Sequence, residues 1–285
     1  MSECSPELFL YTDAHFGHAG GTGFQFIGLP KDPKARSFAG EIEQYLRIKL
    51  PTEMQIAAET GQKVLLPISM RILPLSIQGK TLISRTVPVG QVYRAEGTRG
   101  KPGNILAQAL LFPAATNMDE VMSCAYLMPW ASELDRKTHL DEKALDYPPF
   151  TVELPTGFLD VELKSSSEDL NALLGAVLER LDGGPPVLLQ NTHHDEALAM
   201  FVFIALQLPV QLVERLSWST YEFDGRGGFD VAATRDGTQL DGAHGAYRVP
   251  GSEAMAATYR YAALKIEELG LDFWERLNLP SNVLE

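Results

Sequence analysis

The chain has 285 residues, of which 45% are hydrophobic and 21% charged, so it can bury a core and is not a disordered segment. Lys and Arg number 24 against 37 Asp and Glu, which gives a net charge of −13. That charge excludes general affinity for nucleic acid or anionic membranes, because phosphate binding requires clustered cations.

The cysteines and the start of the chain indicate the cellular setting. Cys4 and Cys124 are too few for a disulfide scaffold, and no basic segment precedes the first apolar run, as a signal peptide requires. The longest apolar stretch, residues 198–212, is broken by Gln and Pro and is too short to span a bilayer. We therefore expect a cytoplasmic protein with reduced thiols.

The first elements are predicted to be a hairpin and a helix. Residues 8–12 and 24–29 are apolar and aromatic, and a glycine-rich loop separates them, as is typical of two strands of a hairpin. Residues 38–50 carry apolar side chains near helical spacing, and Pro51 follows them. This spacing predicts a helix over 38–50.

The next segment is predicted to be a run of strands. Val, Ile and Leu dominate residues 64–68, 70–77 and 81–89, which Pro or Gly separates, and this predicts a β-meander. Residues 92–99 and 104–112 are predicted to pair with one another across a glycine turn. The first half of the chain is therefore expected to be β-rich.

The pattern becomes helical after a mixed stretch. Residues 167–181 have an apolar stripe at helical spacing that ends at two glycines, and residues 194–206 predict a second helix. A short buried strand is predicted at 187–190. Residues 216–223 and 229–233 predict a second hairpin.

Further helices are predicted at 253–269 and 273–277. Strands followed by mixed helices and strands indicate an α+β fold rather than a regular βαβ alternation. We expect a β-rich lobe over 1–150 and a mixed α/β lobe over 151–285, forming one compact unit.

A carboxylate and two imidazoles follow the first strand in the segment Asp13-Ala14-His15-Phe16-Gly17-His18. This segment resembles the first motif of the metallophosphoesterases, which use two metal ions to activate water. The further ligand motifs of that family are missing, since the chain contains no Gly-Asp dipeptide and Gly103-Asn104 is followed by Ile105 rather than His. We therefore expect no metal, and Asp13, His15 and His18 are the candidate ligands if one is bound.

A second polar segment concentrates cations in an otherwise acidic chain. Glycines between the cations would let backbone amides approach a ligand, and an arginine there could hold a phosphate or carboxylate. The alternative is a solvated polar hairpin. The candidate binding residues are Arg94, Arg99, Lys101, Asn104 and Gln108.

No catalytic residue is predicted. His194 opens a helix whose first-turn acids suit the helix dipole, and the sequence names no partner that would make it a general base. Ser217, Ser219 and Thr220 lie on a predicted strand without the Gly-x-Ser-x-Gly elbow of serine hydrolases. The neighbours of Cys124 indicate core packing.

Three segments, in order, resemble one family. They are 10–30, beginning Leu-Tyr-Thr-Asp; 99–110, Arg-Gly-Lys-Pro-Gly-Asn-Ile-Leu-Ala-Gln-Ala-Leu; and 208–221, which includes Arg-Leu-Ser-Trp-Ser-Thr-Tyr. Together they resemble the N-terminal domain of the bacterial GTPase-associated protein family, found in prokaryotic conflict (anti-phage) systems beside a small GTPase. The resemblance implies an accessory component whose partner is a GTPase, and it carries over no catalytic residues.

The chain departs from that family at one position. The family's Gly-Asn is followed by aromatic residues and then Ala-His, whereas this chain has Ile105, Leu106 and then Ala107-Gln108. An amide does not titrate, so Gln108 favours binding over acid–base chemistry. Family members usually continue beyond such a domain, so we expect a short member or part of a longer chain.

The favoured function is a non-catalytic adaptor of a GTPase-linked bacterial defence system, with no cofactor and a protein partner. An apolar or aromatic surface patch would mark the partner site, with Trp130, Phe158 and Trp274 as candidates. A purely structural or oligomerisation subunit is a further possibility, and the sequence leaves the oligomeric state open. The alternative is a hydrolase of phosphorylated or nucleotide substrates that uses Asp13, His15 and His18 with Arg99 and Asn104.

Overall fold

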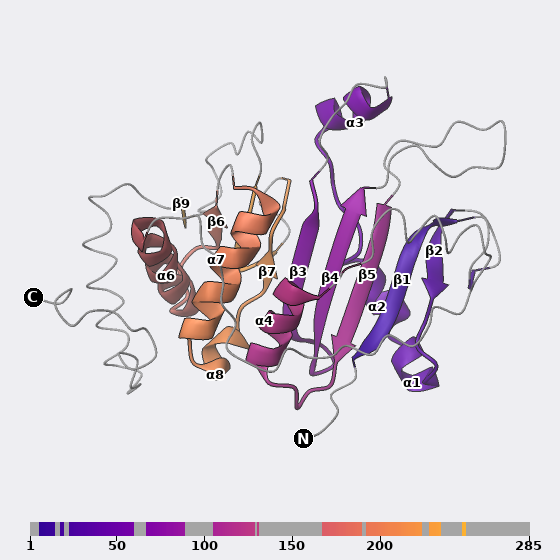
Figure 1. Ribbon diagram of the computed structural model, residues 1–285, viewed down its shortest axis with the longest axis horizontal. Helices are drawn as coiled ribbons and strands as arrows, with labels where there is room; N and C mark the ends of the chain where they lie inside the picture. The colour runs from indigo at the N-terminus through magenta and orange to yellow at the C-terminus, as the bar shows by residue number, and fades with distance from the viewer. Residues whose placement is uncertain are drawn as a thin grey trace, which may run out of the picture.

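The computed structural model describes residues 6–14, 18–19, 23–59, 67–88, 105–128, 130, 167–189, 192–223, 228–234 and 247–248. Within these residues one mixed sheet has nine strands in the order β2-β1-β5-β4-β3-β7-β8-β6-β9 (Figure 1). The strands are β1 (Glu7–Ala14), β2 (Gly23–Gly28), β3 (Ser69–Ile77), β4 (Lys80–Pro88), β5 (Ile105–Phe112), β6 (Val187–Leu189), β7 (Trp218–Ser219), β8 (Val231–Ala233) and β9 (Tyr247–Arg248).

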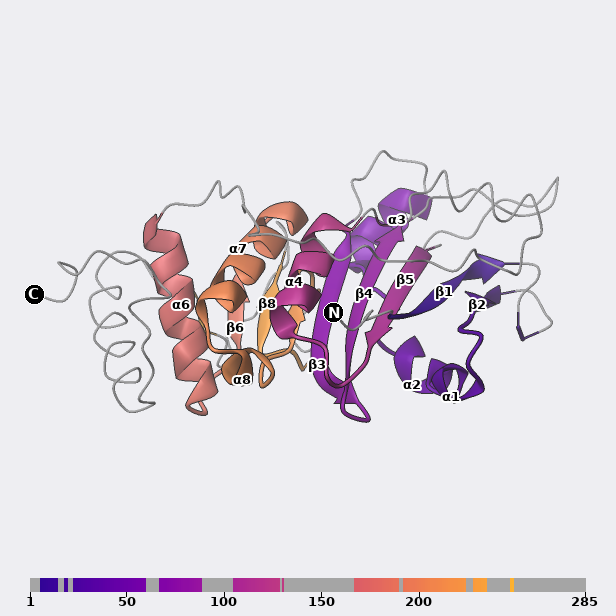
Figure 2. The ribbon, with the colours of Figure 1, turned by 60° about the horizontal axis from the view of Figure 1, so that its bottom comes forward.

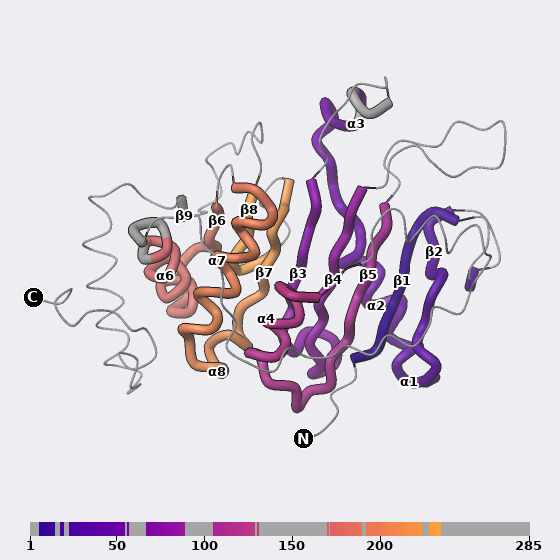
Figure 3. The backbone as a smooth tube through the Cα atoms, viewed as in Figure 1, coloured from indigo at the N-terminus to yellow at the C-terminus, as the bar shows by residue number. Residues whose placement is uncertain are grey.

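The sheet changes character along its width. From β2 to β7 all neighbouring strands are antiparallel, and from β7 to β9 they are parallel. The colours in Figure 3 show that the early strands fill one side of the sheet and the strands after residue 187 fill the other. This segregation confirms the predicted α+β class, with a β-rich first half.

Helices cover both faces of the sheet (Figure 2). One face packs against α4 (Met118–Leu127), α6 (Ser167–Leu181), α7 (His194–Gln207) and α8 (Val210–Val213), and its apolar core includes Ile83, Leu110 and Phe112. The other face packs against the short helix α2 (Ala39–Glu43), preceded by α1 (Pro33–Arg36). None of the helices in the described ranges is long and apolar enough to cross a membrane.

Alternation along β5 explains why this strand is buried from end to end. Leu110 and Phe112 face α4 and α7, whereas Ala109 and Leu111 face the α2 side. Because both faces of the sheet are covered here, the sequence of β5 is almost continuously apolar rather than alternating between apolar and polar residues. Gln108 is its one strongly polar residue, and it is only 2% exposed.

The outer edge of the sheet at β2 is partly covered by the chain itself. The His18 backbone N–H donates to the carbonyl of Phe26 at 3.0 Å, and the Ala19 N–H donates to Gln25 Oε1 at 3.3 Å. In both ribbon views the short segment 18–19 lies beside β2 on the side away from β1 (Figures 1 and 2). The predicted hairpin of β1 and β2 is confirmed.

The helix predicted over 38–50 is much shorter in the structure. Helix α2 ends at Glu43, and a turn and a segment without regular secondary structure follow. Side chains of the sheet bind the carbonyls that a longer helix would use: Ser84 Oγ donates to Tyr45 O and Thr86 Oγ1 donates to Leu46 O. Tertiary hydrogen bonds therefore override the local helical spacing. Helix α3 (Thr52–Glu59), which extends past the strand ends in Figure 1, was not predicted.

One predicted strand pairing is wrong. Strand β5 pairs with β1 on one edge and with β4 on the other, and its predicted partner segment, 92–99, lies outside the described residues. The wrong pairing is the predicted hairpin of 216–223 and 229–233, because β7 and β8 are parallel. Asp230 favours that arrangement, since its carboxylate accepts from both the backbone N–H and the hydroxyl of Ser217.

Other predictions fall partly or wholly outside the described residues. These are the strand at 64–68, of which residues 67–68 are described and are not strand, the segment 92–99, the lobe boundary near residue 150, and the helices at 253–269 and 273–277. The helix at 167–181 is confirmed, and Gly183 follows its end with φ of +90°, a conformation that favours glycine.

Candidate functional site

A row of polar side chains interrupts the apolar face that α7 covers. Arg85 on β4 lies directly opposite Gln108 on β5, and Met70 on β3 lies on the other side of Arg85. The residues two positions away, Ile83 and Leu110, belong to the apolar core. Polar groups in such a position lose their contact with water, so they require specific partners.

His194, the first residue of α7, connects this row to the end of β7. Its Nδ1 lies 2.7 Å from Thr220 Oγ1, which in turn accepts the backbone N–H of Met70 at 2.8 Å. Because the hydroxyl accepts from Met70, its own proton can go to Nδ1, and His194 then carries its proton on Nε2. We call Arg85, Gln108, His194 and Thr220 the polar row.

The surroundings keep His194 neutral. Burial lowers its pKa to about 4; Asp195 acts in the opposite direction, whereas Arg85 and His193 lower the pKa further. Burial also lowers the pKa of Arg85, and Asp195 raises it. A histidine with so low a pKa is a poor general base at neutral pH, so the polar row is better suited to hydrogen bonding than to proton transfer.

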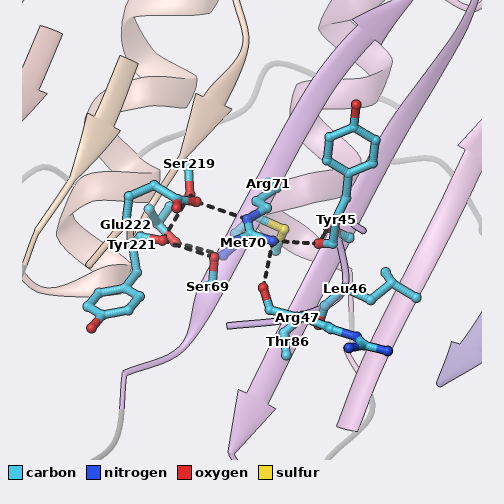
Figure 4. A network of polar contacts seen from close by, with 12 residues as sticks. Tyr45, Leu46, Arg47, Ser69, Met70, Arg71, Thr86, Ser219, Tyr221 and Glu222 are labelled. Atoms are coloured by element: carbon cyan, nitrogen blue, oxygen red, sulfur yellow. Dashed lines mark hydrogen bonds and ion pairs between the residues drawn. The ribbon is translucent and has the colours of Figure 1, made fainter. Parts of the chain in front are cut away.

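Arg71 follows Met70 on β3 and lies over the ring of Phe229, so its side chain is on the opposite face of the sheet. Figure 4 shows the buried ion pair that Arg71 forms there with Glu222. Arg71 Nε is 3.0 Å from Glu222 Oε1, and the two side chains are only 9% and 10% exposed. The same carboxylate oxygen accepts the hydroxyl of Ser219 at 2.8 Å. Arg71 Nη1 donates to the carbonyls of Tyr45 and Arg47, at 2.8 and 2.9 Å. The guanidinium thus joins β3, the turn after β7 and the segment after α2.

The segment after α2 ends in a second polar contact, near the surface. The Tyr11 hydroxyl donates to Glu43 Oε1 at 2.7 Å, and Arg47 Nη2 donates to the same oxygen and to the Tyr11 hydroxyl. Burial, followed by the hydrogen bond to Glu43, raises the pKa of Tyr11 to about 12. Phe24, 43% exposed, stacks on the Tyr11 ring with centroids 6.1 Å apart.

Two family models match the chain. The model for GTPase-associated protein 1, N-terminal domain type 2, matches residues 7–149, about half of the chain, and the model for the GTPase-associated protein 1 middle domain matches residues 158–248. The chain belongs to the GTPase-associated protein 1 family. A search of curated proteins finds no match.

The two matched domains of GTPase-associated protein 1 share the single sheet. The N-terminal domain supplies β1 to β5, the middle domain supplies β6 to β9, and they meet where β3 pairs with β7. The family resemblance is confirmed, although its third segment, 208–221, lies in the middle domain. The Arg71–Glu222 pair lies at the junction between the domains, and the polar row crosses it, with Arg85 and Gln108 in the N-terminal domain and His194 and Thr220 in the middle domain.

The predicted binding residues of this family member divide between described and undescribed positions. Gln108 lies in the polar row, where it pairs across the strands with Arg85. Arg94, Arg99, Lys101 and Asn104 lie outside the described residues. Whether they meet Gln108 in one site stays a prediction.

The candidate metal ligands are only partly described. Asp13 lies three residues beyond Leu10 on β1, so strand alternation places it on the α2 face, opposite to Gln108. His18 lies beside β2, and His15 falls outside the described residues. In the part of the chain that the structure describes, no three His, Cys, Asp or Glu side chains are grouped so as to hold a metal ion.

Of the candidate surface aromatics, only Trp130 is described. It is partly buried against the core under α4, and its Nε1–H donates to the Ala125 carbonyl at 3.2 Å. Phe158 and Trp274 lie outside the described residues. Cys124 is buried in α4 among apolar residues, as predicted.

Sequence reasoning named Gln108 and weighed His194 and Thr220, but it missed Arg71, Arg85 and Glu222. Arg85 carried a usable signal, because it shares a strand face with apolar Ile83 and Val87, and Gln108 stands alone in an apolar strand. Thr220 is the partner that the sequence did not name for His194. The pairing of Arg71 with Glu222, 151 residues apart, carried no local signal.

Proposed function

We propose that this chain is a non-catalytic adaptor of a GTPase-linked bacterial conflict system, that it works in the cytoplasm, and that its partner is a small GTPase. The observation that carries the proposal is the match to both the N-terminal and the middle domain of GTPase-associated protein 1. The association with a GTPase follows from family membership. The adaptor role and the defence context are the proposed part.

The contacts of the polar side chains support an adaptor role over a catalytic one. Arg71, Glu222 and Asp230 each bind several groups of the fold and so hold the sheet and its connections together. His194 is buried and lies at hydrogen-bond distance from Thr220. Burial lowers its pKa to about 4, so the side chain is neutral at pH 7. We therefore infer that these side chains stabilise the fold.

The connection between β4 and β5 is the region that we propose for partner binding. It contains Arg94, Arg99, Lys101 and Asn104, so it concentrates cations in a chain of net charge −13. A GTPase carries a bound nucleotide phosphate and acidic surface groups, and either would attract such a segment.

Binding to a GTPase tests the proposal directly. The full chain is mixed with a small GTPase from the same genome, loaded with GDP or with a non-hydrolysable GTP analogue, and complex formation is measured by analytical ultracentrifugation. We expect a complex that weakens at least about tenfold in the Arg99→Ala/Lys101→Ala variant, since each charged contact contributes about 1.5–3 kcal/mol. Lys31→Ala/Lys34→Ala, in and before α1, removes equal charge elsewhere and should leave binding unchanged.

The hydrolase alternative has its own experiment. Metal content by mass spectrometry and phosphodiester cleavage are measured for the wild type and for an Asp13→Ala/His15→Ala/His18→Ala variant. An adaptor shows neither stoichiometric metal nor turnover. Metal and turnover that both disappear in the triple variant, together with no GTPase complex, would overturn the adaptor proposal.

A further inference from the structure

The junction between the two domains is made by few backbone bonds and many side-chain bonds. Strand β7 has two residues, and its register with β3 comprises the pairs Arg71 with Ser219 and Ile72 with Trp218. Beyond the strand, Thr220 N–H donates to Met70 O, and its hydroxyl accepts from Met70 N–H. Ser69 Oγ donates to Tyr221 O. The turn after β7 is therefore held to the N-terminal domain mainly by side chains.

Arg71 carries that connection further into the N-terminal domain. Its Nε–H is directed to Glu222 of the middle domain, while Nη1 donates to the carbonyls of Tyr45 and Arg47 (Figure 4). A guanidinium is a rigid plane, so a rotation that reorients Nε–H also moves the Nη1 donors. Glu222 thereby determines where Arg71 presents its donors to residues 45–47.

The backbone carbonyls of residues 45–47 accept hydrogen bonds from side chains of the sheet. Outside the helix, these three carbonyls accept four side-chain hydrogen bonds: two from Arg71, one from Ser84 and one from Thr86. The Arg47 carbonyl accepts from Arg71. The Arg47 side chain then reaches Glu43 and the Tyr11 hydroxyl near the surface, with its guanidinium-bearing side chain 62% exposed.

We propose that the middle domain controls the conformation of residues 45–47 in the N-terminal domain, with Glu222 acting as a positioning residue through Arg71. A change in the turn 219–222 alters the orientation of Arg71, which releases the Arg47 carbonyl and shifts the exposed Arg47 side chain. The two domains of this family member are thus coupled by a defined polar path rather than only by a shared sheet. The coupling does not depend on the identity of the partner.

Hydrogen exchange in the full chain tests this coupling without any partner. The amides of Tyr45 and Leu46 donate to the carbonyls of Ile42 and Glu43, so their exchange rates report on the segment. In Glu222→Ala we expect both amides to exchange about tenfold faster, although the hydrogen bonds of the Glu222 side chain go to Arg71 and Ser219 rather than to either residue. Glu222→Gln keeps an acceptor oxygen for Arg71 and should accelerate them about threefold.

Asp230→Ala is the matched control. Asp230 pairs with Arg180 and Ser217 much as Glu222 pairs with Arg71 and Ser219, but all three residues lie within the middle domain. It should lower the free energy of unfolding comparably while leaving exchange at Tyr45 and Leu46 within about twofold of the wild type. The proposal is overturned by unchanged exchange in Glu222→Ala, or by equal acceleration in Asp230→Ala. If Glu222→Ala does not fold, unchanged exchange in Glu222→Gln overturns it equally.

Discussion

At the scale of single residues, one hydroxyl at the junction forms hydrogen bonds to two elements of the fold. The Thr220 hydroxyl accepts from the Met70 backbone and lies 2.7 Å from His194, so it joins β3 to α7. The residue is 3% exposed, and water does not replace a lost partner easily at that depth.

Removing this hydroxyl should be costly. Thr220→Val leaves the Met70 N–H and His194 Nδ1 without it, and we expect the free energy of unfolding to fall by about 1–3 kcal/mol in urea titrations at pH 7.5. Thr220→Ser retains the hydroxyl and should lose less than half as much. Equal losses in the two variants would show that the methyl group, not the hydroxyl, carries the effect.

His194 should make stability depend on pH in the acid range. Its folded pKa of about 4 lies below the ordinary value of 6.5, so the unfolded chain binds a proton that the folded chain does not. Stability is then full above pH 6.5 and is lost as the pH falls towards 4, by up to about 3 kcal/mol. Urea titrations at pH 7.5, 5.5 and 4.5 should show a smaller loss for His194→Gln than for the wild type.

At the scale of elements, the limits of sequence reasoning follow from where the decisive partner lies. The helix at 167–181 was predictable because its apolar stripe and its terminal glycines are local. The end of α2 was not, because Arg71, Ser84 and Thr86 bind the carbonyls of 45–47 from strands far along the chain. The parallel pairing of β7 and β8 likewise depends on the Asp230 contact with Ser217.

The same contrast holds for the candidate site. Gln108 could be singled out because it stands where the resembled family has a histidine, and Asp13 because it follows an apolar strand. The two side chains lie on opposite faces of the sheet because Leu10 on β1 pairs with Gln108 on β5. This register could not be predicted from the sequence. His194 was visible as a helix start, but its Thr220 partner required the tertiary fold.

Two glycines should respond in opposite ways to the same substitution. Gly183→Ala places a side chain at φ of +90° and should lower the free energy of unfolding by about 1–2 kcal/mol. Gly40→Ala lies within α2, where an added Cβ meets nothing within 4 Å, and should raise it by about 0.5–1 kcal/mol. Thermal unfolding monitored by circular dichroism compares them. A stabilised Gly183→Ala would contradict the helix-end geometry.

At the scale of the whole molecule, one sheet runs through both matched domains. Trp218 lies at their junction, fully buried between Ile72 and Val231 and packed on Phe201. Its loss would disturb both domains together, because the N-terminal and middle strands contact the same indole.

We therefore expect the two domains to unfold together. Trp218→Phe removes part of the ring and should lower stability by about 1–3 kcal/mol, with far-UV circular dichroism and hydrogen exchange in β5 and β8 reporting one shared transition. Leu75→Ala, at an exposed leucine outside the junction, should change stability by less than about 0.5 kcal/mol. Separate transitions for β5 and β8 would show that the domains fold independently.

The short return of the chain beside β2 has a consequence for behaviour at high concentration. An open sheet edge offers unpaired backbone groups to any other extended chain, and fibrous aggregation begins at such edges. Here the His18 amide occupies the Phe26 carbonyl, and Ala19 is held by the Gln25 side chain. The return therefore blocks the addition of another strand at Phe26, and we expect a variant that lacks residues 18–19 to form thioflavin-positive aggregates at high concentration while its binding to a GTPase is unchanged.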